Sequence, residues 1–401
     1  MTKQALQDEA VKLALSYKNL LLSWCTGCGK TFGFIQAQEA LKSKKTLIVV
    51  AEIAHIQGWR DEYYKHRKEY LLKSTTIICY ASLHKQVHES YDLMCLDEAH
   101  RITDTRADYL RTIEVSNVIA LTATIGWDNL DILEGIWGRF YEFKVTLEQA
   151  IEWGIIPKPA IHLIPMKLDD LERTEIVWFS RGKRTQLGIC QYPARWGYLT
   201  NKKKYPNLHL EIRCTPLEKY EYLSSQMNYL SRRYQNSMSE FDRIQWLRAG
   251  SDRKRFLTSL KTNMAHKYVS DLFEQKKRFI CFCGSIDQAN ILGGKNVLHS
   301  KTDDPQRVID NFNSKKINSL FVVNMLQEGA NLIDIDAGVI IQLDSIERSF
   351  IQKTGRTLRS KYHPEVYILY FENTRDEEYV RKSIQDINPE YINKLPYDDP
   401  N

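Results

Sequence analysis

Long apolar runs are absent from this sequence of 401 residues. No segment approaches the roughly 18 uninterrupted apolar residues that a membrane-spanning helix needs. The opening residues, MTKQALQDEA, lack the basic start and apolar core of a signal peptide. Fixed-period repeats and low-complexity tracts are also missing. We therefore expect a globular, cytoplasmic protein that has no membrane partner.

The sequence also lacks the cysteine spacing of a disulfide framework or a zinc ribbon. Most of its eight cysteines lie in apolar runs such as TTIICY and FICFC, which favours reduced thiols in a protein core. Cys25 and Cys28 form one C-x-x-C pair, but Cys281 and Cys283 have the wrong spacing for a second pair of zinc ligands. Packing of small residues is the favoured role of Cys25 and Cys28, and redox inhibition is the alternative. No Ser-His-Asp or Cys-His constellation supports nucleophilic catalysis.

Neither sign of charge dominates the chain as a whole. The 56 Lys and Arg residues exceed the 50 Asp and Glu residues by only 6. The excess is local, because residues 167–267 hold 20 basic and 10 acidic residues, and the rest of the chain has a net charge of −4.

Aromatic residues are interleaved with the bases of this block. Bases would neutralise phosphates and aromatic rings would stack on nucleobases, so we predict nucleic-acid contact for the stretch 181–204. The alternative is a solvated helical insertion whose aromatic residues are core. The predicted contact residues are Arg181, Lys183, Arg184, Lys202, Lys203 and Lys204.

Short apolar runs alternate with helical patterns in two parts of the chain. They lie at residues 20–23, 46–51, 76–80, 92–96 and 118–121, and again at 279–283, 319–324, 338–343 and 366–371. Such alternation is typical of a parallel sheet covered by helices on both faces. Between the two sets, apolar residues step by three or four along 217–234 and 241–247, which indicates helices. The sequence thus predicts an α/β protein with two parallel-sheet domains and a mainly helical, basic insertion.

A glycine-rich turn follows the first apolar run. Residues 20–31 read LLLSWCTGCGKT and lead into a helical pattern. Glycines let backbone N–H groups surround a phosphate, and the helix N-terminus adds partial positive charge. Lys30 would reach the β- and γ-phosphates, and the Thr31 hydroxyl would hold Mg²⁺. Trp24 stands where the strict pattern has its first glycine, and the alternative is a plain strand–turn–helix corner. The predicted binding residues are Thr26, Gly27, Cys28, Gly29, Lys30 and Thr31.

Two adjacent carboxylates end the apolar run at residues 92–96. Asp97 would take Mg²⁺ through its water shell, while Glu98 would orient or deprotonate the attacking water. Both roles need a strand end beside the phosphate loop, and doubly wound sheets bind ligands at the carboxyl ends of their strands. A solvated acidic turn is the alternative. The two motifs strengthen each other, because nucleotide hydrolysis needs both parts.

With these motifs the sequence resembles the superfamily 2 helicases and translocases that have a DEAH box. Residues 97–100 read DEAH, and residues 26–31 match the family's T-G-x-G-K-T. Trp24 and Cys25 stand where the family usually has Ala-Pro. The resemblance implies that both α/β units have the RecA-like fold and that ATP and Mg²⁺ bind between them. It also implies that closure and opening of the two units move the protein along nucleic acid.

Further motifs follow in the family's order. Thr122-Ala123-Thr124 resembles the T-A-T motif that couples hydrolysis to movement, and the resemblance gives His100 the role of linking the γ-phosphate side to this motif. Residues 47–59 resemble the segment that meets the nucleic-acid backbone. Gln7, which precedes Lys30 by 23 residues, is the candidate for the glutamine that contacts adenine.

The second half of the chain has matches of its own. Residues 322–332 resemble the motif whose Glu328 and Gly329 touch nucleotide and strand, and residues 352–359 match Q-x-x-G-R-x-x-R. An arginine stabilises the charge that spreads over the γ-phosphate in the transition state. Arg356 and Arg359 would share one helical face and reach the nucleotide only when the two units close. The predicted catalytic residues are Lys30, Asp97, Glu98, Gln352, Arg356 and Arg359.

One segment points to a subfamily. Residues 150–159, AIEWGIIPKP, resemble the entry to the second motor domain in phage branch-migration helicases and restriction-type translocases. Together with the compact length, this resemblance favours a phage or mobile-element origin, which would place the protein in the host cytoplasm.

These observations predict three parts of the chain. RecA-like motor domain 1 spans residues 1–144, motor domain 2 spans 145–372 and contains the basic insertion 167–267, and a C-terminal tail spans 373–401. The predicted function is that of a monomeric, ATP-dependent DNA helicase or translocase that uses ATP and Mg²⁺. The alternatives are a duplex-DNA translocase that separates no strands, an RNA helicase and a non-enzymatic nucleic-acid-binding module.

Overall fold

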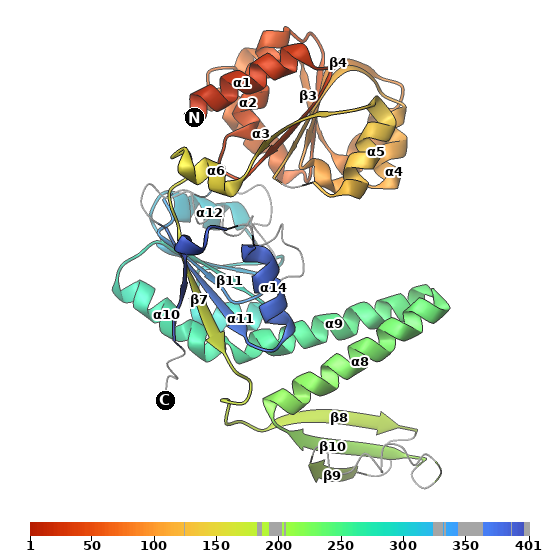
Figure 1. The fold of residues 1–401 in the computed structure, drawn as a ribbon, viewed down its shortest axis with the longest axis vertical. Coiled ribbons are helices and arrows are strands. Elements are labelled where there is room, and N and C mark those ends of the chain that lie inside the picture. The colour runs from red at the N-terminus through yellow and green to blue at the C-terminus, as the bar shows by residue number, and fades with distance from the viewer. Residues whose placement is uncertain are drawn as a thin grey trace.

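The fold is seen in a computed structural model of the chain. It describes residues 1–123, 125–182, 187–191, 203, 206–323, 332, 334–343, 364–385 and 387–396. Figure 1 shows one body of sheet and helix from the first part of the chain and a second body mainly from the last part. An arm of two long helices connects the second body to a small sheet.

The first body is built on a six-stranded parallel sheet of strand order β3-β2-β4-β5-β1-β6. Its strands are β1 (Asn19–Trp24), β2 (Thr46–Val50), β3 (Thr75–Cys79), β4 (Ser90–Asp97), β5 (Glu114–Thr122) and β6 (Tyr141–Val145). Its α-helices are α1 (Lys3–Ser16), α2 (Lys30–Leu41), α3 (Ala54–Lys65), α4 (Asp104–Arg111), α5 (Trp127–Trp137) and α6 (Leu147–Glu152). Short 3₁₀ helices are η1 (Glu69–Ser74), η2 (Tyr80–Gln86) and η3 (Ala99–Arg101).

Both faces of this sheet are buried, which explains the uninterrupted apolar runs of its strands. Side chains alternate between faces along a strand. Leu20 and Leu22 of β1 therefore pack with α1 and α2 in one cluster, whereas Leu21 packs with α4 and α5 in another.

The second body is built on a seven-stranded parallel sheet of order β12-β13-β11-β14-β15-β7-β16. Its strands are β7 (Ala160–Met166), β11 (Phe279–Cys283), β12 (Val297–Leu298), β13 (Ser319–Val323), β14 (Ala337–Ile340), β15 (Glu365–Phe371) and β16 (Ile392–Lys394). Its helices are α10 (Thr262–Glu274), α11 (Ile286–Gly293), α12 (Pro305–Asn313), α14 (Arg375–Ile384) and η4 (Pro389–Tyr391). The two parallel sheets confirm the predicted α/β class.

The segment predicted to be a C-terminal tail contributes to this second body. β16 forms an edge of the sheet, where it pairs with β7, and α14 follows β15 directly. The sequence pattern missed β16 because a three-residue edge strand has almost no periodicity to detect.

The arm contains the helices predicted for the basic insertion. They are α8 (Pro216–Ser237) and α9 (Glu240–Leu260), and Thr215 caps α8 through a capping box with Glu218. The small sheet that precedes α8 was not expected. It consists of β8 (Glu175–Arg181), β9 (Leu187–Gln191) and β10 (Leu208–Cys214), with β10 antiparallel to β8 and parallel to β9.

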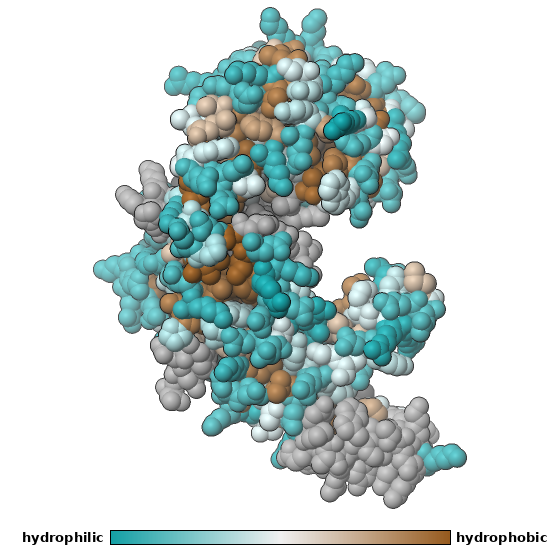
Figure 2. Space-filling model, in the orientation of Figure 1, coloured by the Kyte–Doolittle hydropathy of each residue, from teal (hydrophilic) through white to brown (hydrophobic). Residues whose placement is uncertain are grey.

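At the start of α9, the residues predicted to form an apolar helix face are not buried. Phe241, Ile244 and Leu247 are exposed, because a two-helix arm has too little partner surface to bury them. Figure 2 shows hydrophilic residues over most of the visible surface of the two bodies and the arm. No helix within the described ranges combines the length and the apolar content that crossing a membrane requires.

Candidate nucleotide-binding site

The phosphate loop connects β1 to α2 and depends on two glycines. Gly27 and Gly29 have φ angles of 98° and 86°, in the left-handed region that other residues rarely adopt. A Cβ on Gly29 would lie 2.8 Å from Gln7 Nε2 and 2.9 Å from Lys3 Cε. The loop therefore needs glycine for its backbone and for the close approach of α1.

Lys30 and Thr31 are the first two residues of α2, which begins two residues earlier than the predicted helical stretch. The Lys30 ammonium donates a 2.7 Å hydrogen bond to the Trp24 carbonyl oxygen and so lies across the loop. Because the first N–H groups of a helix have no partner within the helix, the start of α2 presents backbone donors beside this ammonium. This arrangement suits an anionic phosphate group.

Helix α1 supplies two side chains to the same loop. Thr2 caps α1 by accepting a hydrogen bond from the Ala5 backbone N–H at 3.1 Å. One turn further along, Gln7 is buried and lies against Gly29, so the candidate adenine contact is placed beside the loop. Lys3 was not predicted, yet its Nζ donates to the Gly27 carbonyl oxygen at 3.1 Å. No pattern in the sequence could have marked this lysine.

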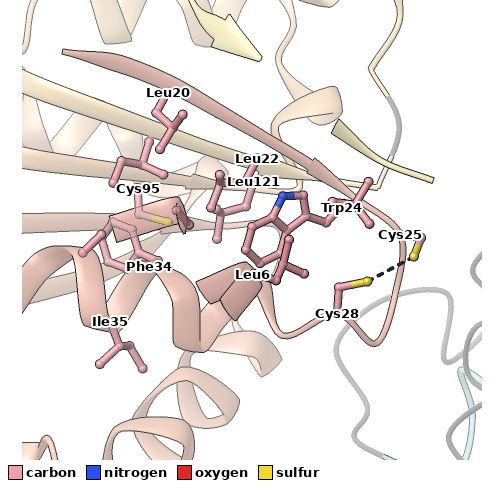
Figure 3. Close-up of a cluster of buried hydrophobic side chains, with 14 of the residues drawn as sticks. Leu6, Leu20, Leu22, Trp24, Cys25, Cys28, Phe34, Ile35, Cys95 and Leu121 are labelled. Carbon is pink, nitrogen blue, oxygen red and sulfur yellow. Dashed lines mark hydrogen bonds between the residues drawn. The ribbon is translucent and has the colours of Figure 1, made fainter. Parts of the chain in front are cut away.

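Cys25 and Cys28 lie in the loop as a pair of buried thiols (Figure 3). Their sulfur atoms are 3.2 Å apart, and Cys25 Sγ also donates to the Thr146 carbonyl oxygen at 3.6 Å. The hydrogen bond between them, together with burial, raises the pKa of Cys25, and the same hydrogen bond lowers the pKa of Cys28. Both thiols belong to the apolar cluster around Trp24 and Leu6, which agrees with a packing role.

The acidic pair lies at the same edge of the sheet as the loop. In the parallel register Ser23 of β1 is opposite Thr122 of β5, and Asp97 of β4 is opposite Leu121 of β5. The carboxyl ends of β1, β5 and β4 therefore stand side by side.

Two donors hold the Asp97 carboxylate. Its Oδ2 accepts a hydrogen bond from Trp59 Nε1 at 2.8 Å, and its Oδ1 accepts one from the Glu98 backbone N–H at 3.1 Å. Glu98 has a φ of 50°, which turns the chain sharply from β4 into η3. Sequence reasoning missed Trp59, although residues 47–59 carried a resemblance whose last residue is this tryptophan.

The predicted coupling residues meet in the structure. His100 Nδ1 and Thr122 Oγ1 are 3.1 Å apart, and His100 Nδ1 is 3.4 Å from Glu98 Oε2. His100 thus touches the acidic pair and the end of β5 at once. Thr124, the other predicted coupling residue, lies outside the described residues.

Most predicted residues of the second motor and of the basic stretch also lie outside the described ranges. They are Glu328, Gly329, Gln352, Arg356, Arg359, Lys183, Arg184, Lys202 and Lys204. Arg181 is the last residue of β8, and Lys203 is exposed.

Two family models match separate segments of the chain. Residues 1–126 match the type III restriction enzyme res subunit, and residues 260–361 match the helicase conserved C-terminal domain. Together these matches support a superfamily 2 helicase. No curated protein matches the chain.

Solved structures resemble this chain at low sequence identity. S. cerevisiae Dbp5 bound to RNA and ADP BeF3 is 12% identical, with a TM-score of 0.54 over 97% of this chain and 89% of that chain. The ATP-dependent type ISP restriction-modification enzyme LlaBIII bound to DNA is 11% identical, with a TM-score of 0.56 over 99% of this chain and 31% of that chain. The Pyrococcus furiosus Hef helicase domain is 15% identical, with a TM-score of 0.47 over 95% and 97% of the two chains. The first two matches confirm the RecA-like fold of both parallel-sheet domains.

Proposed function

We propose that this chain is an ATP-dependent DNA helicase or translocase. The observation that carries the proposal is the convergence of three motifs at one sheet edge. The phosphate loop follows β1, the Asp97-Glu98 pair ends β4, and the contact between His100 and Thr122 joins this pair to β5. Superfamily 2 helicase domains are in general nucleic-acid-dependent ATPases, and the Dbp5 structure contains ADP BeF3, which supports the use of a nucleotide by this chain.

The residues at this edge fit ATP with Mg²⁺. Magnesium in proteins is held by one or two carboxylates together with substrate phosphates, rather than by a cage of protein ligands. At this edge of the sheet, the Asp97 carboxylate and the Thr31 hydroxyl are the candidate groups for holding magnesium. When bound, the ion would neutralise phosphate charge.

Each side chain then has a proposed role. Lys30 binds the β- and γ-phosphates, and Glu98 orients or deprotonates the attacking water. Gln7, which lies against the loop, contacts the adenine. His100 links the γ-phosphate side of the site to Thr122 of the T-A-T motif.

The second domain completes the proposed motor. Arg356 and Arg359 stabilise the transition-state charge, and Gln352 belongs to the same sequence motif. Glu328 and Gly329 contact the nucleotide and the nucleic-acid strand. Because these residues belong to the second unit, hydrolysis would require the two units to close, which couples it to movement. The proposed division keeps residues 1–144 and 145–372, with the insertion 167–267, apart from two changes. Helix α6 packs with the first domain, and α14 and β16 of the predicted tail 373–401 belong to the second.

DNA is the proposed track, and the basic stretch 181–204 is its proposed contact. The net charge of +10 within residues 167–267 supports this contact, since counterion release drives nucleic-acid binding. The LlaBIII structure contains DNA and the Dbp5 structure contains RNA, so an RNA track is the second candidate. A phage or mobile-element setting is proposed from the resemblance of residues 150–159.

Substitution of Lys30 tests the ATPase. Hydrolysis should be measured at stated salt with forked DNA, duplex DNA, single-stranded DNA and RNA, because salt dominates such affinities. We expect Lys30→Ala to abolish stimulated hydrolysis, while Lys12→Ala, at an exposed position of α1, behaves as the unsubstituted chain. Full stimulated hydrolysis by Lys30→Ala would overturn the proposal.

A second comparison separates the kinds of motor. Strand displacement from a fork reports unwinding, whereas displacement of a third strand from duplex DNA reports translocation alone. Triplex displacement without fork unwinding would favour the duplex translocase. Stimulation by RNA alone would favour the RNA helicase, and absence of hydrolysis with every ligand would favour the non-enzymatic binding module.

A further inference from the structure

One buried contact at the acidic pair has no role in the proposed function so far. The indole N–H of Trp59, on α3, donates a 2.8 Å hydrogen bond to Asp97 Oδ2, on β4. The Trp59 side chain is 3% exposed. Because the Glu98 backbone N–H occupies the other carboxylate oxygen, the two donors together fix the rotation of the carboxylate plane.

The ring of Trp59 is itself held in place. It packs edge-on against Phe34, with ring centroids 5.6 Å apart at an interplanar angle of 80°. Phe34 is fully buried and lies four residues after Lys30 on α2, the helix that begins at the phosphate loop. Trp59 therefore connects α2 to Asp97, although β5 separates β1 from β4 in the sheet.

The need to satisfy a buried indole does not by itself account for this bond. Trp24 belongs to the same apolar cluster and is completely buried, yet its indole N–H has no hydrogen-bond partner among the described residues. The core of this domain thus tolerates an unbonded indole. A hydrogen bond to a charged carboxylate is about twice as strong as one between neutral groups, so the Trp59 bond restrains Asp97 effectively.

We propose that Trp59 is a positioning residue that orients the Asp97 carboxylate for the Mg²⁺ of the bound nucleotide. The inference rests on the proposed function. It predicts that Trp59 affects metal-dependent binding through Asp97, whereas nucleotide contacts that need no metal remain intact. Groups that orient a metal ligand in this way typically change metal affinity by about 10-fold to 100-fold when removed.

The test is Trp59→Phe in the full chain, which removes the N–H and keeps an aromatic ring against Phe34. Titrations of a fluorescent ADP analogue should be made with Mg²⁺ and with a chelator in its place. We expect the variant to need about 10-fold more Mg²⁺ for half-maximal binding, with unchanged affinity in the chelator. In the ATPase assay, saturating Mg²⁺ should restore most of the turnover.

Trp137→Phe is the matched control, because it removes a partly buried indole from α5 on the opposite face of the sheet. It should leave the Mg²⁺ requirement unchanged. Equal losses of affinity with and without Mg²⁺ in Trp59→Phe, or an unchanged Mg²⁺ requirement, would overturn the inference. If the unsubstituted chain hydrolyses ATP and Trp59→Phe has the same Mg²⁺ dependence as that chain, only this inference is overturned. An unsubstituted chain that neither binds nor hydrolyses ATP overturns the proposed function as well.

Discussion

At the phosphate loop, the difference between a hydrogen atom and a methyl group decides which backbone conformation is accessible. Gly29 adopts a φ of 86° and leaves room for Gln7 and Lys3 of α1. An added Cβ would disfavour this φ angle and would clash with the side chains of Gln7 and Lys3. The loop geometry and the placement of α1 therefore depend on the same residue.

Replacing Gly29 with alanine is expected to weaken nucleotide binding and to lower the free energy of unfolding by about 1–2 kcal/mol, the cost of a side chain in the left-handed region. Fluorescent-nucleotide titration and denaturant unfolding would measure the two effects. Gly135→Ala in α5 is the control, because no described atom lies within 4 Å of the added methyl group. It should stabilise the helix by up to about 1 kcal/mol. Equal effects of the two substitutions would contradict the argument.

At the scale of elements, neighbouring strands define the environment of groups that titrate. His162 of β7 stacks on Tyr367 of β15, with ring centroids 4.9 Å apart. Burial lowers the pKa of His162, although the nearby Glu365 carboxylate opposes this shift, and Lys277 adds to it. The stack and the charges come from three strands or loops that are distant in sequence.

This lowered pKa predicts an acid-sensitive stability. An unfolded histidine binds a proton near pH 6.5, while folded His162 resists protonation until a lower pH. The unfolded state then binds more protons, so stability is complete above about pH 6.5 and falls as the pH drops below it. We expect His162→Phe, which keeps the ring stack, to lose less stability between pH 7.5 and pH 5.5 in denaturant unfolding. His84→Phe, at an exposed position, should retain the original pH dependence, and identical profiles for both variants would count against this assignment.

At the scale of the whole molecule, one buried ion pair joins the arm to the second body. Lys261 follows α9 and is fully buried, and its Nζ lies 2.6 Å from Asp376 Oδ2 at the start of α14. The same ammonium donates to the Ile341 carbonyl oxygen at 2.9 Å. The end of α9 is thus bound to the start of α14, and the two paired residues are 115 positions apart in the sequence.

Lys261→Met should destabilise the second body by about 3–5 kcal/mol, because it leaves the Asp376 carboxylate buried without its cation. Adding Asp376→Leu to the same chain should recover much of this loss, since it removes the remaining charge. Lys12→Met, which breaks an exposed pair with Glu9, should cost less than about 1 kcal/mol. Denaturant unfolding measures all three. A Lys261→Met chain as stable as Lys12→Met would show that the buried pair contributes little.

Local patterns explain why much of the fold and of the nucleotide site could be predicted. Uninterrupted apolar runs marked the core strands because both faces of each parallel sheet are covered. The small sheet of the insertion was not predicted, because only one of its faces is buried and its strands therefore lack uninterrupted apolar runs. In β8, for example, Val177 is buried and the next residue, Trp178, is exposed. The start of α9 was misjudged for a related reason, since helical periodicity shows that a face is apolar but not that another element covers it.

The sequence by itself determined the chemistry that each segment can perform. A glycine turn before Lys30, adjacent carboxylates at Asp97 and Glu98, and the alternation of strand and helix are local properties that follow from residue type and spacing. Tertiary structure alone decided which of these groups meet. The bond from Trp59 to Asp97, the reach of Lys3 to Gly27 and the contact of His100 with Thr122 depend on strand order and register, which arise from packing between segments far apart in the chain.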